Sequence, residues 1–274
     1  MKILVNIVLK SALLVIFQSG VYAQDIRFLN SGRNQPIEID ADKSIEWHQE
    51  AQAYIARGNA KAKQGDVVVY ADLLTAFYKK LRKGGTQIWR IDADGNVRII
   101  SPDQKAFGDK GVYDVGKALF VLTGKPRLET KTEQISASKS LEFWEKKSIA
   151  VARGNAIAIK GDKRLKASVL TAHFEKTQKG NNEIIRVNAF DDVVVSSPKE
   201  VIRGKIGTYN VKTGIIIIRG DVKITRGPDQ LNGNKAEVNL NTGVSRLLSA
   251  GGKKVQGLFG PNNLRPELKQ RDLK

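Results

Sequence analysis

Cysteine is absent from all 274 residues, and the only histidines are His48 and His173. Without cysteine the chain has neither disulfides nor a thiolate nucleophile, so its stability must come from burial and backbone pairing. No constellation of partner residues surrounds either histidine, and we interpret both as surface or strand-face side chains. Metal-ligand spacings are also missing. These absences argue against an enzyme, and we expect no cofactor and no metal.

Long apolar runs are missing too, apart from one at the N-terminus. Met1-Lys2 precedes an apolar stretch from Ile3 to Phe17, and Val21-Tyr22-Ala23 has the small-x-small form of a signal-peptidase site. The stretch is about fifteen residues long and contains polar interruptions, whereas a spanning helix needs about twenty residues. We therefore expect export with cleavage after Ala23, and a periplasmic protein, in preference to a membrane anchor.

Acidic residues are scarce relative to basic ones: 46 lysines and arginines face 28 aspartates and glutamates, which gives a formal net charge of +18. Such a charge favours anionic partners, among them nucleic acid, anionic lipid, acidic polysaccharide and phosphorylated glycolipid. We expect no nucleic acid as the partner of an exported protein. The basic residues are spread along the chain, and we interpret much of the excess as a solvated face that also protects strand edges.

The chain repeats itself with a spacing of 96 residues. Arg57-Gly58-Asn59-Ala60 recurs as Arg153-Gly154-Asn155-Ala156, and residues 204–214 resemble residues 233–243, which begins a third copy. Because the register needs no gaps, we expect each copy to stack on the previous one through a shared surface. The predicted copies are residues 37–132, residues 133–228 and a partial third copy at 229–256.

Within each copy the apolar residues follow the period of β-strands. Ile37-Glu38-Ile39-Asp40 and Tyr113-Asp114-Val115 alternate apolar and polar side chains. Residues 69–81 and 166–176 are the best helix candidates, but their strand-like entry and β-branched residues favour strands. Turn residues predict short hairpin connections at Gly58-Asn59, Asp94-Gly95-Asn96, Gly124-Lys125-Pro126, Gly154-Asn155, Thr213-Gly214, Gly220-Asp221 and Thr242-Gly243.

An open stack of antiparallel strands leaves its first and last strands unpaired. Proteins use such edges to add a strand from another chain, so we expect the truncated third copy to be an interface for the next molecule. The lead-in at residues 24–36 and the tail at residues 257–274 show little periodicity. We expect the basic tail to be flexible.

Two sets of charged residues are candidates for chemistry. The paired acids Asp191-Asp192 and Asp92-x-Asp94 suit glycoside hydrolysis in principle, but they coincide with turn positions, where aspartate is common. Arginines beside the turns suit phosphate through their fork of donors, although they equally suit the solvation of those turns. The phosphate-contacting candidates are Arg57, Arg90, Arg153 and Arg186.

Four ordered motifs carry a family resemblance: Gln35-Pro36-Ile37-x-Ile39-x-Ala41-Asp42, Arg57-Gly58-Asn59-Ala60, Gly108-Asp109-Lys110-x-x-Tyr113-Asp114-Val115 and Val121-Leu122-Thr123-Gly124. They resemble the LptA/OstA-like family of lipopolysaccharide transport proteins over residues 35–252. The resemblance implies a twisted, open antiparallel β-jellyroll that binds the lipid A portion of lipopolysaccharide. It also implies head-to-tail association, between an inner-membrane complex that contains LptC and the outer-membrane protein LptD. The longer chain, its duplication and its basic tail leave open whether it is the bridge protein or a sibling of the same fold.

An inner face of alternating apolar residues would shield acyl chains, at about 0.8 kcal/mol for each methylene. The resemblance places Ile37, Ile39, Tyr113 and Val115 at lipid-facing positions. The alternatives are an ordinary close-packed core without room for lipid, and an envelope protein that only stacks by its edges. The predicted lipid-binding set is Ile37, Ile39, Val97, Ile99, Tyr113, Val115, Leu119, Val121, Tyr209, Val211 and Ile217.

Overall fold

The computed structural model describes residues 37–82, 84–178, 182–242, 244–249 and 254–260. The predicted signal segment with its cleavage site, the lead-in and the tail from residue 261 lie outside them. Nearly all of the described chain is antiparallel β-sheet, with a single short 3-10 turn, η2 (Glu145–Lys147). No helix in this part of the chain is long and apolar enough to cross a membrane. The all-β, open antiparallel class expected from the sequence is confirmed.

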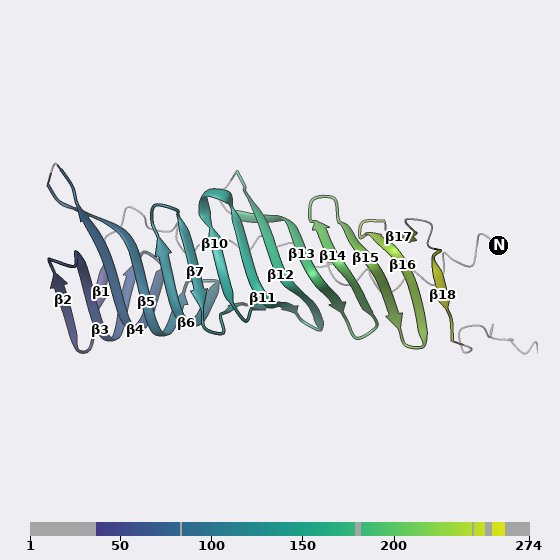
Figure 1. Cartoon of the computed structure of the whole chain (residues 1–274), viewed down its shortest axis with the longest axis horizontal. Helices are drawn as coiled ribbons and strands as arrows, with labels where there is room; N and C mark the ends of the chain where they lie inside the picture. The colour runs from purple at the N-terminus through teal and green to yellow at the C-terminus, as the bar shows by residue number, and fades with distance from the viewer. Residues whose placement is uncertain (1–36, 83, 179–181, 243, 250–253, 261–274) are drawn as a thin grey trace, which may run out of the picture.

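The strands follow one another along the long axis of the molecule, from β2 at one end to β18 at the other (Figure 1). Those of the first half are β1 (Glu38–Asp40), β2 (Ser44–His48), β3 (Ala53–Gln64), β4 (Val67–Lys80), β5 (Thr86–Ile100), β6 (Gln104–Asp114), β7 (Leu119–Thr123), β8 (Arg127–Thr130) and β9 (Glu133–Ser136). Those of the second half are β10 (Ser140–Trp144), β11 (Ile149–Lys160), β12 (Lys163–Lys176), β13 (Asn182–Ser196), β14 (Val201–Asn210), β15 (Ile215–Arg226), β16 (Asp229–Asn239), β17 (Val244–Leu248) and β18 (Gln256–Leu258). The strands expected at residues 69–81 and 166–176 are confirmed as β4 and β12.

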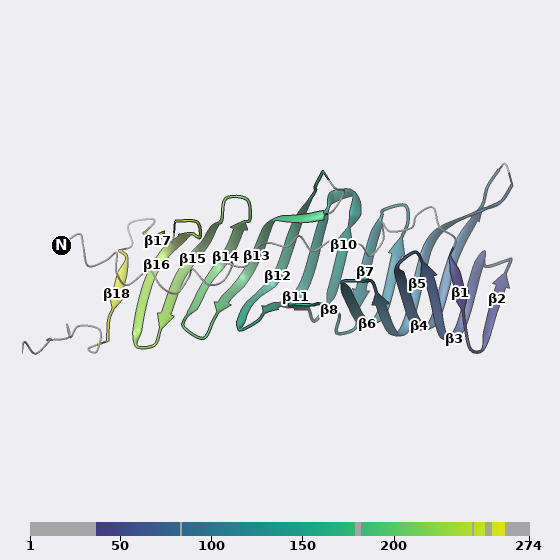
Figure 2. The same cartoon turned by 180° about the vertical axis from the view of Figure 1, so that it is seen from behind.

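The long strands bend in the middle, and their two halves belong to two walls. In β3, residues 53–57 pair with β2, whereas residues 61–63 pair with β1. The strands β6, β11 and β16 change partners in the same way. We call the side that runs from β2 through β7 and β10 to β17 the first wall. The side that runs from β1 through β8 and β9 to β18 is the second wall, and Figure 2 shows β1 and β8 from behind.

The bends come from consecutive residues with positive φ. Gly58 and Asn59 have φ values of 81° and 42°, and the β3–β4 register shifts at this point. Two successive left-handed residues form a bulge that turns the strand without ending it. The hairpins predicted at Gly58-Asn59, Asp94-Gly95-Asn96, Gly154-Asn155 and Gly220-Asp221 are therefore wrong, because these residues lie inside β3, β5, β11 and β15. Thr213-Gly214 does form a turn, between β14 and β15.

The bulges recur in the register of the sequence repeat. The shift between Arg57 and Ala60 in β3 has a counterpart between Arg153 and Ala156 in β11. The shifts at 94/97 in β5 and 190/193 in β13 are also 96 residues apart. These recurrences agree with the repeat, whose exact boundaries stay a sequence prediction.

The sheet continues beyond the predicted start of the tail. Gly257 and Leu258 belong to β18 and pair with Leu231 and Gln230 of β16. A strand of three residues is too short to show a period in the sequence, which explains why the tail was predicted to begin at residue 257.

The core lies between the two walls in three successive clusters. The first is built from β3 to β6 with Leu122 of β7, the second from β11 to β13 with Ala137, and the third from β14 to β16 with Leu240. Each cluster combines residues from both halves of the bent strands, for example Leu74 and Ile99 in the first. Burial between the walls therefore holds them together along the whole length.

Candidate functional site: an apolar groove between two walls

One row of apolar side chains crosses every strand of the first wall on its inner face. Leu122, which is 1% exposed, identifies this face as the one directed at the core. Small and large side chains share the row, with alanine and glycine at half of its positions. The row consists of Ile45, Ala56, Leu74, Ala93, Gly111, Leu122, Leu141, Ala152, Leu170, Ala189, Gly207, Ile218, Ala236 and Leu247.

Two further rows extend this surface. The second row of the first wall is Trp47, Tyr54, Ala76, Ile91, Tyr113, Phe120, Phe143, Ala150, Ala172, Val187, Tyr209, Ile216, Val238 and Ser245. The inner row of the second wall is Ile39, Ala62, Val69, Ile99, Ala106, Leu128, Ile135, Ala158, Leu165, Val195, Ile202, Ile224, Leu231 and Gly257. We call the apolar surface formed by these three rows the groove; many of its residues are buried against one another in the three core clusters, and the pocket described below lies at its C-terminal end. Ser245 is its only hydrogen-bonding side chain apart from the amphipathic Trp47, Tyr54, Tyr113 and Tyr209.

Five of the eleven predicted lipid-facing residues have inward positions. Ile39, Ile99, Tyr113 and Tyr209 belong to the three rows, and Val97 is buried in the first core cluster. Three others, Ile37, Val115 and Val211, lie just beyond strand ends, where Ile37 and Val115 are exposed and Val211 is partly buried. Whether any of them contacts lipid stays a prediction.

Leu119, Val121 and Ile217 are on the opposite face, so their predicted inward placement is wrong. Val121 pairs with Val112 and Glu142, and Ile217 pairs with Thr208 and Glu237. Leu119 pairs with Asp114 and Trp144. The runs that contain them, residues 119–122 and 215–218, are apolar on both faces, so alternation could not reveal which face is inside.

The N-terminal mouth of the groove carries aromatic side chains. Trp47 on β2 is 59% exposed, and its ring stacks 6.0 Å from that of Tyr54. Its Nε1 donates a 2.7 Å hydrogen bond to the Tyr78 hydroxyl, while Ile45 beside it is 58% exposed. This cluster was not predicted from the sequence, although Ile45 and Trp47 alternate with polar residues in β2. Amphipathic aromatic side chains of this kind suit the entrance of an apolar channel from water.

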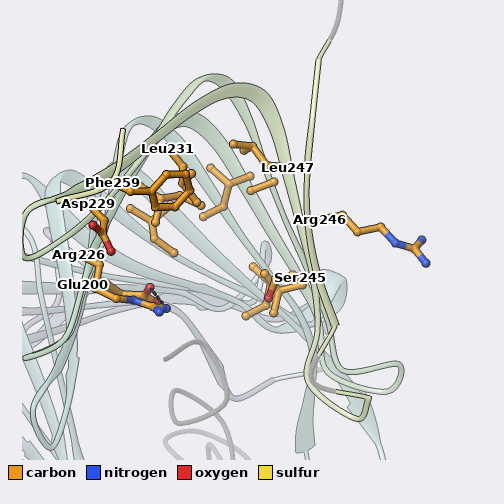
Figure 3. Close-up of a pocket in the computed structure, with 14 residues that line it drawn as sticks. Glu200, Arg226, Asp229, Leu231, Ser245, Arg246, Leu247 and Phe259 are labelled. Carbon is orange, nitrogen blue, oxygen red and sulfur yellow. Dashed lines mark hydrogen bonds and ion pairs between the residues drawn. The ribbon is translucent and has the colours of Figure 1, made fainter. Parts of the chain in front are cut away.

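The C-terminal mouth is a pocket with an apolar body and charged residues at one end (Figure 3). Arg226 Nη2 lies 3.2 Å from Glu200 Oε2, and the Glu200 side chain is 2% exposed. Asp229 is also buried and accepts a 2.9 Å hydrogen bond from the backbone N–H of Gly260. Figure 3 shows the Arg246 side chain directed away from the other labelled residues. The apolar lining is Ile202, Ile216, Ile218, Ile224, Leu231, Ala236, Val238, Leu247 and Phe259.

The four arginines singled out for phosphate lie on the outer face of the first wall. Arg57 Nε is 3.0 Å from Glu46, Arg153 Nε is 2.7 Å from Glu142, and Arg90 Nε is 2.6 Å from Asp92. Arg186 instead approaches His173, with 3.4 Å between Nη2 and Nδ1. Three of the four already hold a carboxylate, and phosphate contact by any of them stays a prediction.

Two carboxylates of the first wall are held in their charged form. Hydrogen bonding to His48, then Ser44, lowers the pKa of Glu46 to about 2. Burial raises the pKa of Glu142, but hydrogen bonds from Arg153, Trp144 and Ser140 outweigh it and lower the pKa overall. Both residues are therefore structural anions in neutral solution.

The acid pairs considered for catalysis lie outside the groove. Asp94 Oδ1 is 2.9 Å from Lys110 Nζ on the outer face of β5, not in a turn as predicted. Asp191 and Asp192 are exposed in the β13 bulge, with positive φ values of 58° and 53°. Burial, then the charge of Arg186, lowers the pKa of His173, which keeps this ring neutral near pH 7. The described residues contain no group of three or more side chains suited to a metal ion.

Both ends of the walls have strands with one neighbour. Within the described residues, β1 and β2 pair only with β3, and β17 and β18 pair only with β16. Each of these four strands therefore presents one backbone edge without a partner strand in this part of the chain.

Comparison with known proteins finds a family model, a sequence relative and a solved structure that are similar to this chain. The family model described as LptA/(LptD N-terminal domain) LPS transport protein matches residues 38–139 and again residues 137–244. An uncharacterized protein, R00383, of Rhizobium meliloti (strain 1021) is 34% identical over 101 residues, which are 35% of this chain and 54% of that protein, so the chain spans just over half of this relative's length. LptH of Pseudomonas aeruginosa, described as the LptA homologous periplasmic component of the conserved lipopolysaccharide transport device, has a TM-score of 0.40 and 17% identity, with 47% of this chain and 95% of LptH covered. Because the two family matches together span most of its length, the chain belongs to the LptA/LptD N-terminal domain family of lipopolysaccharide transport proteins.

Proposed function

We propose that this protein is a non-catalytic periplasmic carrier that holds the lipid A acyl chains of lipopolysaccharide in its groove. The observation that carries the proposal is the register of the three rows, which keeps an apolar surface continuous from β2 to β17 and from β1 to β18. An acyl chain gains about 0.8 kcal/mol for each methylene moved from water to such a surface. Family membership supports lipopolysaccharide as the amphiphile.

The similarity of neighbouring positions supports transport in preference to permanent storage. Along the first row, Leu141, Leu170 and Ile218 are separated by alanine or glycine and are similar in size and hydrophobicity. A lipid that moves by a few strands exchanges one such contact for another. The free energy of the lipid therefore changes little along the path, because the free energy of apolar burial scales with the buried area and does not depend on the direction of the contact.

The unpaired edges support a bridge made of several proteins. An edge strand binds another chain by completing its backbone hydrogen bonds. Joined in this way, the groove of one molecule continues into the next, and neighbours of the LptC type and the LptD type extend it towards the inner and outer membranes. A second candidate, an assembly protein that stacks by the same edges without lipid, rests on the edges alone.

Native mass spectrometry of the purified chain with added lipopolysaccharide tests the proposal. We expect bound glycolipid at defined stoichiometry, together with oligomers whose proportion rises with protein concentration. Oligomers that never carry glycolipid, even with excess lipopolysaccharide, would support the assembly protein and contradict the carrier.

A further inference from the structure

The outer face of the second wall carries cations that the groove does not use. On β12, β14 and β15, the exposed residues Arg164, Lys166, Arg203 and Lys223 form what we call the cation cluster. The pairing places Lys166, Val194, Arg203 and Lys223 in one row across β12 to β15. The neighbouring row is Arg164, Ser196, Val201 and Thr225, so neither row contains an acid across these four strands.

These cations differ from those of the first wall in their partners. Among the described residues, no member of the cluster lies within ion-pair distance of a carboxylate. On the first wall, by contrast, Lys110 lies directly opposite Asp94 and 2.9 Å from it, and Lys235 lies 2.8 Å from Glu237. Arg219 likewise lies opposite Lys235 on the first wall, but there Lys235 is paired with Glu237, whereas no member of the cation cluster has such a carboxylate in the described part of the chain.

The arrangement also costs stability. Arg203 and Lys223 are direct cross-strand neighbours, and like charges in that position repel. The fold does not require Lys166 or Arg203, because the residues 96 positions earlier are Tyr70 and Phe107, which occupy strands of the same form, whereas the corresponding position before Lys223 holds another cation, Arg127. A charge arrangement that destabilises the folded chain and is not needed for its strands points to an external anion.

We infer that the cation cluster docks the protein onto a membrane surface that carries anionic phospholipid headgroups. The cluster covers an area and not a line, since its rows are about 7 Å apart and its strands span about 15 Å. It lies on a sheet face, where the two rows can meet several headgroups together. Each Lys or Arg near an anionic leaflet strengthens partitioning about fivefold. The inference does not rest on the groove, which faces the other side of the same strands.

Vesicle co-sedimentation of the full chain tests this inference. The probe is phosphatidylcholine vesicles with about 30 mol % phosphatidylglycerol, which contain no lipopolysaccharide. We expect the quadruple variant Arg164→Gln, Lys166→Gln, Arg203→Gln and Lys223→Gln to bind at least about tenfold more weakly than the parent, and high salt to reduce the binding of the parent. The matched control, Lys110→Gln, Lys117→Gln, Arg219→Gln and Lys235→Gln, removes the same charge from the first wall and its β6–β7 turn, and is expected to bind several-fold more tightly than the cluster variant.

Equal vesicle binding by the cluster variant and the control would overturn the inference, since net charge alone would then explain it. Binding to soluble polyphosphate without binding to vesicles would also overturn it, in favour of a linear polyanion. All three proteins share the same N-terminal segment, so the difference between them reports the cluster. Lipopolysaccharide loading of the cluster variant is expected to match the parent in native mass spectra, which separates this outcome from any failure of the carrier proposal.

Discussion

At the scale of single residues, the two copies of the repeat use the same positions with different chemistry. Glu46 and Glu142 are 96 residues apart, and each accepts hydrogen bonds from a serine and an arginine. The third partner differs, since it is His48 for Glu46 and Trp144 for Glu142. Glu46 lies on the strand β2 at the end of the wall, while Glu142 lies between β7 and β11. The same hydrogen-bonded network thus orders β2 at the free edge of the first wall and β10 at its internal junction between β7 and β11.

The lowered pKa of Glu46 makes a prediction about acid. The folded-state pKa is about 2, against an ordinary value of 4.5, so its contribution to stability is complete above pH 4.5 and is lost as the pH falls towards 2. We expect Glu46→Gln to lower the thermal midpoint by an amount that is constant above about pH 5 and shrinks below pH 4.5. Thermal unfolding followed by circular dichroism between pH 7 and pH 2.5 measures this. Glu50→Gln, in the exposed β2–β3 turn, is the control; a Glu46 effect that does not change with pH would contradict the account.

At the scale of elements, the bends are the feature that makes two walls out of one series of strands. Four of the bulges begin with glycine, at Gly58, Gly95, Gly154 and Gly220, whereas the β13 bulge begins with Asp191. All five residues have positive φ values. Glycine adopts this conformation without the steric cost that a Cβ brings.

The bends give a pair of opposite stability predictions. Asp191→Gly is expected to stabilise the protein by about 0.5–1 kcal/mol, because it removes the left-handed penalty. Gly154→Ala is expected to destabilise it by more than about 1 kcal/mol, since φ is +83° and the new Cβ would lie 2.5 Å from Ser138 Oγ. Denaturant unfolding measures both changes. Two changes of the same sign would show that backbone conformation does not control these bends.

The small residues of the first row yield a prediction about groove capacity. A Cβ on Gly207 would meet Val193 and Ala189 at 3.4 and 3.5 Å, which is ordinary contact, so the extra bulk of Gly207→Leu has to extend into the groove. We expect this variant to fold but to bind less lipopolysaccharide, by about tenfold or more if the path is blocked. Thr208→Leu adds bulk on the outer face and is the control. Native mass spectrometry and a thermal melt measure occupancy and folding, and normal loading of Gly207→Leu would argue against a lipid path at β14.

At the scale of the whole molecule, the sequence predicted the class of fold, the unpaired ends and part of the inner face. Where apolar and polar residues alternate, as at Tyr113 and Tyr209, the inward direction was correct. The prediction of inward-facing residues failed at Leu119, Val121 and Ile217, because a run of consecutive apolar residues does not show which face of the strand is buried. The glycine pairs signalled positive φ but could not tell a bend from a hairpin, since both need left-handed residues.

The C-terminal pocket could not have been predicted by the same reasoning. Glu200 and Arg226 are 26 positions apart and meet only because β14 and β15 pair in their particular register. Phe259 joins them through β18, a strand of three residues that leaves no period in the sequence. A site whose residues meet only through the register of paired strands therefore cannot be predicted from sequence patterns and is found only in the three-dimensional structure.

Site-specific photocrosslinking to lipopolysaccharide tests the central claim most directly. A photoreactive residue is placed at the inner positions Phe120 and Val187, and at their outer neighbours Val121 and Asn188, so that each pair differs only in the face of the wall. We predict strong labelling from both inner positions and little from the outer ones, in each copy of the repeat. Equal labelling from the two faces, or labelling confined to the outer face, would contradict a lipid path between the walls.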